Sequence, residues 1–251
     1  MIAIARYVLI FFYFVFVCTY ACLFSLVRPF HRDNVRKVSQ LFGKTATLMG
    51  VDVEVRVPDS IKDIQSCVYV ANHQNSLDLF LISPGVQPGT VTVGKKDLLW
   101  IPFFGQMYWL TGNILIDRNN RGKAFNTIAQ TVKKINERGI SVWMFAEGTR
   151  SYGRGLLPFK TGAFHTAIQA KVPIVPLCMS STTDLVKANR WDNGKVIIEI
   201  LEPWDVSNET KDTVRDLAER VHSTMKAKIA QLDEELSNGN QTKVDKVEKA
   251  S

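Results

Sequence analysis

A histidine and an aspartate placed five residues apart are the first side chains in this 251-residue chain that could do chemistry. His73 and Asp78 lie in the segment 72–78, Asn-His-Gln-Asn-Ser-Leu-Asp, directly after the apolar segment 67–71. At this spacing two side chains leave a helix or a strand on different faces, so they meet only where a turn intervenes. A carboxylate that accepts the Nδ1–H of an imidazole fixes its tautomer and leaves Nε2 free to take a proton. The pair predicts a general base, His73, oriented by Asp78, with a simple helix-capping turn as the alternative.

A second polar segment follows another apolar run. Residues 147–151 read Glu-Gly-Thr-Arg-Ser and come directly after the apolar segment 140–145. Gly148 permits an unusual backbone angle, Thr149 offers a hydroxyl, and Arg150 offers a planar fork of donors, a combination that suits a phosphate group. The alternative is an exposed loop in which the glutamate pairs with Arg150.

The elements that would position these side chains alternate from residue 50 onward. Expected strands cover 51–57, 67–71, 90–93, 113–116, 140–145, 174–179 and 196–201, and expected helices cover 121–138 and 210–236. Apolar strands separated by amphipathic helices predict an α/β domain over residues 51–236, with a mostly parallel sheet covered by helices on both faces. Ligand sites in such sheets lie at the carboxyl ends of strands, where both polar segments begin.

The N-terminal region, residues 1–50, predicts a membrane anchor. Residues 7–27 contain no charged side chain, and as a helix they would reach ~31 Å, about the thickness of the hydrocarbon core of a bilayer. A cleaved signal peptide is the less favoured alternative, because its apolar core is usually only ~7–15 residues long. A second, basic and amphipathic helix is expected over 34–49. The basic residues that follow the first helix place the bulk of the chain in the cytoplasm, whereas full span and single-leaflet insertion both remain open.

Composition excludes several classes of protein. With 46% apolar and 22% charged residues, the chain is neither disordered throughout nor collagen-like. The first 50 residues contain six basic side chains and one acidic side chain, Asp33. Much of the net charge of +7 therefore lies in this one region, and a nucleic-acid partner is not expected. The four cysteines, at 18, 22, 67 and 178, show no zinc-ligand spacing and predict neither a metal site nor a disulfide scaffold. Residues 237–251 are polar and predict a disordered tail.

Taken in order, these segments resemble the bacterial 1-acyl-sn-glycerol-3-phosphate acyltransferases. The N-H-x-x-x-x-D motif of the family matches Asn72, His73 and Asp78, and its E-G-T-R-S motif matches residues 147–151. Residues 94–96, 112–118 and 172–176 resemble further blocks of the family. Two departures are Ala146, where proline is usual, and Asn75, where serine is common, and neither removes a reacting group.

The resemblance implies specific roles. His73 would deprotonate the sn-2 hydroxyl of lysophosphatidic acid, which attacks an acyl thioester directly to give phosphatidic acid, and Asp78 would orient His73. The implied glycerol-phosphate site combines the residues Glu147, Gly148, Thr149 and Arg150, with added positive charge from Arg118 and Lys160. Acyl-CoA or acyl-acyl carrier protein would serve as co-substrate, without a metal or other cofactor. A covalent acyl-enzyme on Ser76 is disfavoured, because no G-x-S-x-G elbow surrounds it.

The resemblance also implies a place in the cell, and it leaves two alternatives. The enzyme would contact membrane lipids at the bacterial inner membrane, with its catalytic domain on the cytoplasmic face. A lipid hydrolase could use the same pair to activate water, and a non-catalytic lipid-binding protein would not need it. The aromatic segment 98–110 is expected either to join the core or to contact an acyl chain or the membrane interface.

Overall fold

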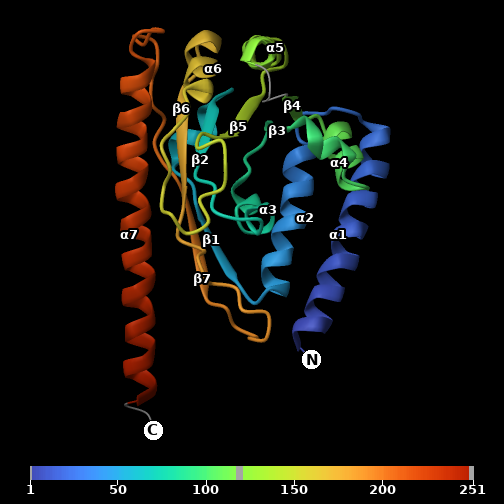
Figure 1. Ribbon diagram of the computed structural model, residues 1–251, viewed down its shortest axis with the longest axis vertical. Coiled ribbons are helices and arrows are strands. Elements are labelled where there is room, and N and C mark those ends of the chain that lie inside the picture. The colour runs from blue at the N-terminus through green and yellow to red at the C-terminus, as the bar shows by residue number, and fades with distance from the viewer. Residues whose placement is uncertain (1, 117–120, 249–251) are drawn as a thin grey trace.

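The computed structural model describes the backbone of residues 2–116 and 121–248, and their side chains except at 121–126 and 240–248. Within these residues the chain forms one seven-stranded sheet with helices packed on both sides (Figure 1). The strands are β1 (Asp52–Arg56), β2 (Val68–Ala71), β3 (Thr90–Lys95), β4 (Ile114–Ile116), β5 (Ser141–Phe145), β6 (Ile174–Met179) and β7 (Lys195–Ile200).

The sheet has the order β1-β7-β6-β2-β5-β3-β4. Neighbouring strands are parallel except for β6 and β7, so β1 and β7 run opposite to the other five. Every residue of β2 and β6 is buried, which explains why these central strands are continuously apolar in the sequence. The edge strand β1 instead alternates apolar with charged residues. The predicted fold class, a mostly parallel α/β sheet, is confirmed.

Helices cover the sheet from two sides. On one side α5 (Arg121–Arg138), α6 (Gly162–Ala170) and α7 (Val214–Glu248) form a row, in which α6 contacts β2 and α7 contacts β6. On the other side α2 (Asn34–Leu48) packs against the short helix α3 (Asp78–Leu81) and against β1 and β3. Figure 1 shows α7 and α2 on opposite sides of the sheet. Fully buried side chains such as Trp143 and Phe164 fill the core.

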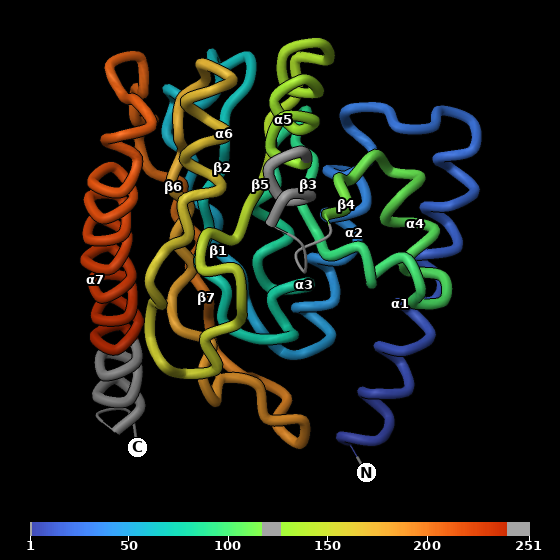
Figure 2. The backbone as a smooth tube through the Cα atoms, turned by 45° about the horizontal axis from the view of Figure 1, so that its top comes forward, coloured from blue at the N-terminus to red at the C-terminus, as the bar shows by residue number. Residues whose placement is uncertain are grey.

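The N-terminal helix α1 (Ile2–Val27) lies along the outside of α2 and α4 (Phe104–Leu110), far from α7 (Figures 1 and 2). One face of α1 packs into a small apolar cluster with α2 and α4 that includes Val17, Phe42 and Phe104. The opposite face carries eleven exposed large side chains: Ile4, Tyr7, Val8, Leu9, Phe11, Phe12, Phe16, Tyr20, Leu23, Leu26 and Val27. By length and composition, α1 could cross a membrane.

The C-terminal region differs from the prediction of a tail that is disordered from residue 237. Helix α7 continues to Glu248, twelve residues beyond the predicted end at Leu236. The extension contains no proline to end the helix, and the helix continues although most of its residues, Gly239 among them, are weak helix formers.

Candidate active site

Two neighbouring parallel strands bring the predicted segments together. In the register of β2 and β5, Ala71 pairs with Phe145, so both polar segments leave the sheet at the same edge. Beyond the strands, the backbone N–H of Ser151 donates to the carbonyl of His73 at 2.8 Å, and that of Tyr152 donates to the carbonyl of Gln74 at 2.8 Å. The two loops are thus hydrogen-bonded to each other, as their position after adjacent strands led us to expect.

His73 and Asp78 meet across a turn. Nδ1 of His73 lies 2.7 Å from Oδ2 of Asp78, which is the first residue of α3 and is 1% exposed. The same oxygen accepts the backbone N–H groups of Gln74 (2.6 Å) and Asn75 (3.3 Å). The imidazole stacks on the ring of Phe145 with 4.0 Å between centroids. No described residue hydrogen-bonds to Nε2 of His73, so the geometry fits an oriented base with a free nitrogen.

The turn that carries His73 is tied to the end of β6. The side-chain amide of Gln74 donates to the carbonyl of Ser180 (2.8 Å), and its oxygen accepts the N–H of Thr182 (2.8 Å). Asn75 donates to the hydroxyl of Thr182 and accepts the N–H of Leu77, each at 2.8 Å. Asn75 therefore shapes the turn before α3. Thr182 was missed by sequence reasoning, because only the β2–β6 adjacency brings a residue 107 positions away from Asn75 into contact.

Glu147 faces the backbone of the two loops. Its carboxylate is 3% exposed, and its two oxygens accept the backbone N–H groups of His73 (2.6 Å) and Leu157 (2.9 Å). Burial raises the pKa of Glu147, and these two hydrogen bonds oppose that effect by favouring the carboxylate. Both oxygens are thus engaged by the backbone, so the role of Glu147 at the phosphate site, which stays a prediction, would be to position the loop. Within the described residues Glu147 makes no ion pair with Arg150 either.

The basic side chains of the loop after β5 remain available to an anion. Arg150 is half-buried, and its Nη1 donates to the hydroxyl of Tyr152 at 3.2 Å. Gly148 has a φ of +69°, and a Cβ there would lie 2.9–3.0 Å from the side chain of Lys160. Lys160 therefore extends over Gly148, while Thr149 is exposed beside it. These residues form an open, positively charged surface next to the pair of His73 and Asp78, called the dyad below. Arg118, which was expected to add charge, lies outside the described residues.

Among the side chains that the structure describes, no three His, Cys, Asp or Glu residues are placed together to hold a metal ion, at the His73–Asp78 pair or elsewhere. The four cysteines are free thiols. Burial raises the pKa of Cys18 and Cys178 to about 12 in each case, so neither is a reactive thiolate at neutral pH.

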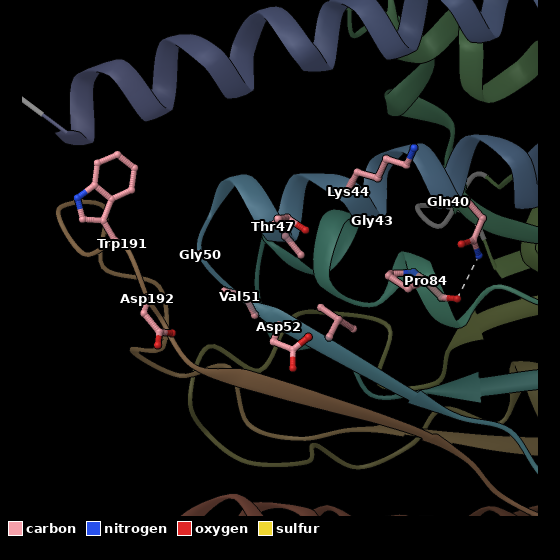
Figure 3. A pocket seen from close by; sticks show the side chains of 12 residues that line it. Gln40, Gly43, Lys44, Thr47, Gly50, Val51, Asp52, Pro84, Trp191 and Asp192 are labelled. Atoms are coloured by element: carbon pink, nitrogen blue, oxygen red, sulfur yellow. Dashed lines mark hydrogen bonds between the residues drawn. The ribbon is translucent and has the colours of Figure 1, made fainter. Parts of the chain in front are cut away.

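A hollow of about 580 Å³ lies away from this site, between α2 and the edge strand β1 (Figure 3). Its wall includes Lys44 and Thr47 of α2, Asp52 at the start of β1, Pro84, and Trp191 from the loop before β7. None of the residues that line it belongs to the two polar segments. The hollow is therefore distinct from the place where the dyad and Arg150 meet.

The aromatic segment 98–110 divides between core and surface. Phe104 and Tyr108 of α4 are buried against α1 and α2. Trp100, Phe103 and Trp109 are 81%, 53% and 49% exposed. The core and surface interpretations therefore apply to different residues of the same segment.

Comparison with known proteins agrees with the geometry. A profile of the family described as Acyltransferase matches residues 52–180. The chain is 52% identical to the 1-acyl-sn-glycerol-3-phosphate acyltransferase of Haemophilus influenzae over 240 residues, which cover 96% of this chain and 100% of that one. Its identity to the protein of the same name from Escherichia coli K12 is 52% over 237 residues, or 94% and 97% of the two chains.

A solved structure is similar as well. It is that of the 1-acyl-sn-glycerophosphate (LPA) acyltransferase PlsC from Thermotoga maritima, with a TM-score of 0.69 and 27% identity. The match covers 92% of this chain and 97% of that one.

Proposed function

The chain belongs to the family of 1-acyl-sn-glycerol-3-phosphate acyltransferases, and from this membership we propose its complete reaction, mechanism and location. It is an acyltransferase, and its acceptor in the proposal is 1-acyl-sn-glycerol 3-phosphate, acylated on the sn-2 hydroxyl. The donor is an acyl thioester, either acyl-CoA or acyl-acyl carrier protein. The products are phosphatidic acid for phospholipid synthesis and the free thiol carrier.

His73 acts as the general base in this proposal, and the observation that carries it is the 2.7 Å contact between His73 and the buried Asp78. Nε2 takes the proton of the sn-2 hydroxyl as that oxygen attacks the thioester carbonyl. The tetrahedral intermediate then expels the thiolate, which receives the proton from the imidazolium. Because a thioester is already activated, a positioned alcohol and a base suffice. Asp78 keeps the proton on Nδ1 and stabilises the imidazolium.

Direct attack is favoured over an acyl-enzyme. Ser76 is exposed, and no hydrogen bond joins its hydroxyl to His73 in the described part of the chain. A serine nucleophile needs such a contact to be activated. Hydrolysis remains a side reaction to exclude, since the same base could act on water.

The acceptor phosphate binds at the loop after β5. The guanidinium of Arg150 supplies a planar pair of donors, with Gly148, Thr149 and Lys160 beside it. In the proposal Arg118, which lies outside the described residues, adds positive charge to this site. This charged surface adjoins His73, so a phosphate held there would leave the glycerol hydroxyl near the base.

Helix α1 lies in one leaflet of the membrane in our proposal, instead of crossing it. Near its start, Arg6 donates to the carbonyl of Ala188 at 3.0 Å. Just after its end, the N–H of Phe30 donates to the carbonyl of Leu110 at 3.0 Å. A helix with both ends held by the same domain keeps them on the same side of the bilayer, and its exposed apolar face then enters the lipid. The domain lies at the cytoplasmic face of the bacterial inner membrane.

The reaction is tested by incubating the purified protein with lysophosphatidic acid and an acyl thioester. Phosphatidic acid is the expected product, in amounts equal to the thiol released, and a His73→Ala preparation is the control. Release of free fatty acid without any acceptor would instead identify a hydrolase. No metal takes part in the proposal, so activity is expected to survive a chelator. Loss of activity in chelator, with recovery on adding zinc, would contradict this point.

A further inference from the structure

We infer that the hydroxyl of Tyr152 is a second donor to the phosphate of the acceptor, beside Arg150, and that it helps to select phosphorylated acceptors. The inference rests on the proposed function, since it assumes that the phosphate binds at Arg150. It adds a residue that lies just outside the E-G-T-R-S segment.

The backbone holds Tyr152 between the two functional loops. Its N–H donates to the carbonyl of Gln74 at 2.8 Å, next to His73 in the chain. Its φ is +48°, a left-handed conformation that a tyrosine rarely adopts and that Gly153, at +80°, continues. Such strained backbone tends to occur where the position of a side chain matters for function. The strain and the cross-loop hydrogen bond together fix where the ring leaves the backbone.

The ring lies at the mouth of the site. The side chain of Tyr152 is 61% exposed, although its backbone is tied to the floor of the site. A large side chain held in this way without being buried gains little from packing. Its exposure leaves the hydroxyl open to a ligand that approaches Arg150.

The hydroxyl is arranged to donate. Its oxygen accepts Nη1 of Arg150 at 3.2 Å, so the phenolic O–H itself can point to another acceptor. Arg150 lowers the pKa of Tyr152, first through this hydrogen bond, and a hydrogen bond with Ser76 has a smaller effect in the same direction. A more acidic phenol is a stronger donor to an anion. Tyr152 is thus hydrogen-bonded to Arg150 through its hydroxyl and to the loop that carries His73 through its backbone.

The simpler alternative is that Tyr152 only orients Arg150. A double-mutant comparison separates the two roles. If Tyr152 contacts the phosphate, Tyr152→Phe will weaken acceptor binding even when Arg150 has been replaced by alanine. If it only orients the guanidinium, the substitution will have no effect in the Arg150→Ala background.

The experiment measures kcat and KM for lysophosphatidic acid and for 1-monoacylglycerol, which lacks the phosphate, in mixed micelles of fixed composition. Four forms of the full chain are compared: wild type, Tyr152→Phe, Arg150→Ala and the double variant. For Tyr152→Phe we expect a KM for lysophosphatidic acid raised roughly 10-fold, because a hydrogen bond to a charged group is lost. We expect an unchanged kcat and an unchanged KM for monoacylglycerol. Ser223→Ala, which removes an exposed hydroxyl from α7 on the far side of the sheet, is the control.

Each result has one meaning. A similar rise in KM in both backgrounds supports direct contact with the phosphate. A wild-type KM in Tyr152→Phe, or a rise that disappears in the Arg150→Ala background, overturns the inference but leaves the proposed function intact. If Arg150→Ala itself leaves the preference for the phosphorylated acceptor unchanged, the proposed phosphate site is wrong, and the inference falls with it. Unaltered thermal unfolding of Tyr152→Phe would show that these changes do not reflect a loss of fold.

Discussion

The chemistry of single residues depends here on a turn, because no regular element could bring His73 to Asp78. Oδ2 of Asp78 both orients the imidazole and accepts two backbone N–H groups of the same turn. One carboxylate oxygen thus builds the turn and sets the tautomer of the base. Replacing Asp78 by alanine would therefore disturb the backbone as well as the chemistry, which makes asparagine the better probe.

We expect His73→Ala to lower kcat about 10²–10⁴-fold, the usual contribution of a general base. Asp78→Asn should lower kcat as well, since an amide keeps an acceptor for the N–H of Gln74 but cannot stabilise the imidazolium. Initial rates with lysophosphatidic acid and acyl-CoA measure both effects, and circular dichroism verifies the fold. Retention of more than half of the wild-type rate by His73→Ala would rule out its role as the base.

Arg150→Ala should chiefly raise the KM for lysophosphatidic acid and leave that for the thioester nearly unchanged. A charge-assisted contact with a phosphate is worth ~1.5–3 kcal/mol, or roughly 10–150-fold. Arg150→Lys should recover only part of this, because an ammonium cannot reproduce the planar fork. The measurement is the ratio of kcat/KM for lysophosphatidic acid and monoacylglycerol. An equal ratio in wild type and Arg150→Ala would show that the phosphate is recognised elsewhere.

Between elements, Glu147 connects the end of β5 to the end of β2. Its oxygens accept N–H groups from His73 and Leu157, so one buried carboxylate sets the spacing of the two loops. Glutamine can accept only one of these hydrogen bonds and turns an NH₂ group toward the other donor. A buried unsatisfied group costs ~1–3 kcal/mol, partly offset because a buried charge is removed.

We therefore expect Glu147→Gln to lower the free energy of unfolding by about 1–2 kcal/mol and to lower kcat through misplacement of His73. Urea unfolding followed by tryptophan fluorescence measures the first effect, and initial rates measure the second. Glu219→Gln on the exposed face of α7 is the control for a change of charge alone. If Glu147→Gln changed the KM for lysophosphatidic acid and nothing else, Glu147 would after all belong to the phosphate site.

The sequence predicted all seven strands of the described fold, the central ones from their continuous apolar runs and β1 from its alternation of apolar and charged residues. It also predicted that the loops carrying His73 and Arg150 leave the sheet at the same edge, since both follow parallel strands. It did not predict that Glu147 faces the backbone. Carboxylates near an arginine are usually paired, and only the position of Leu157, ten residues further on, shows where this one points. The contact of Thr182 with Asn75 likewise depends on strand order, which periodicity does not encode.

For the molecule as a whole, one flank is charged and the other is apolar. The flank of α7 carries ion pairs such as those of Arg220 with Glu209 and Asp216. The flank of α1 carries a continuous row of exposed apolar side chains, which Trp100, Phe103 and Trp109 continue near α4. A patch of this kind on a soluble monomer would promote aggregation. In the proposed membrane-bound state, burial of the α1 flank in a bilayer would remove that cost.

Substitution of Phe12 and Phe16, 64% and 62% exposed on α1, by serine should therefore weaken membrane binding without disturbing the fold. Transfer of a large apolar side chain from water to lipid is worth ~1.5–3 kcal/mol, so the double variant should bind vesicles at least 100-fold more weakly. Flotation with vesicles of phosphatidylethanolamine and phosphatidylglycerol measures the partition.

Val57→Ser, which alters an exposed apolar residue at the end of β1, is the control. Activity should fall on vesicles and persist in detergent micelles, where the acceptor is delivered without a bilayer. Equal partition of the double variant and wild type would show that α1 is not the membrane-binding element.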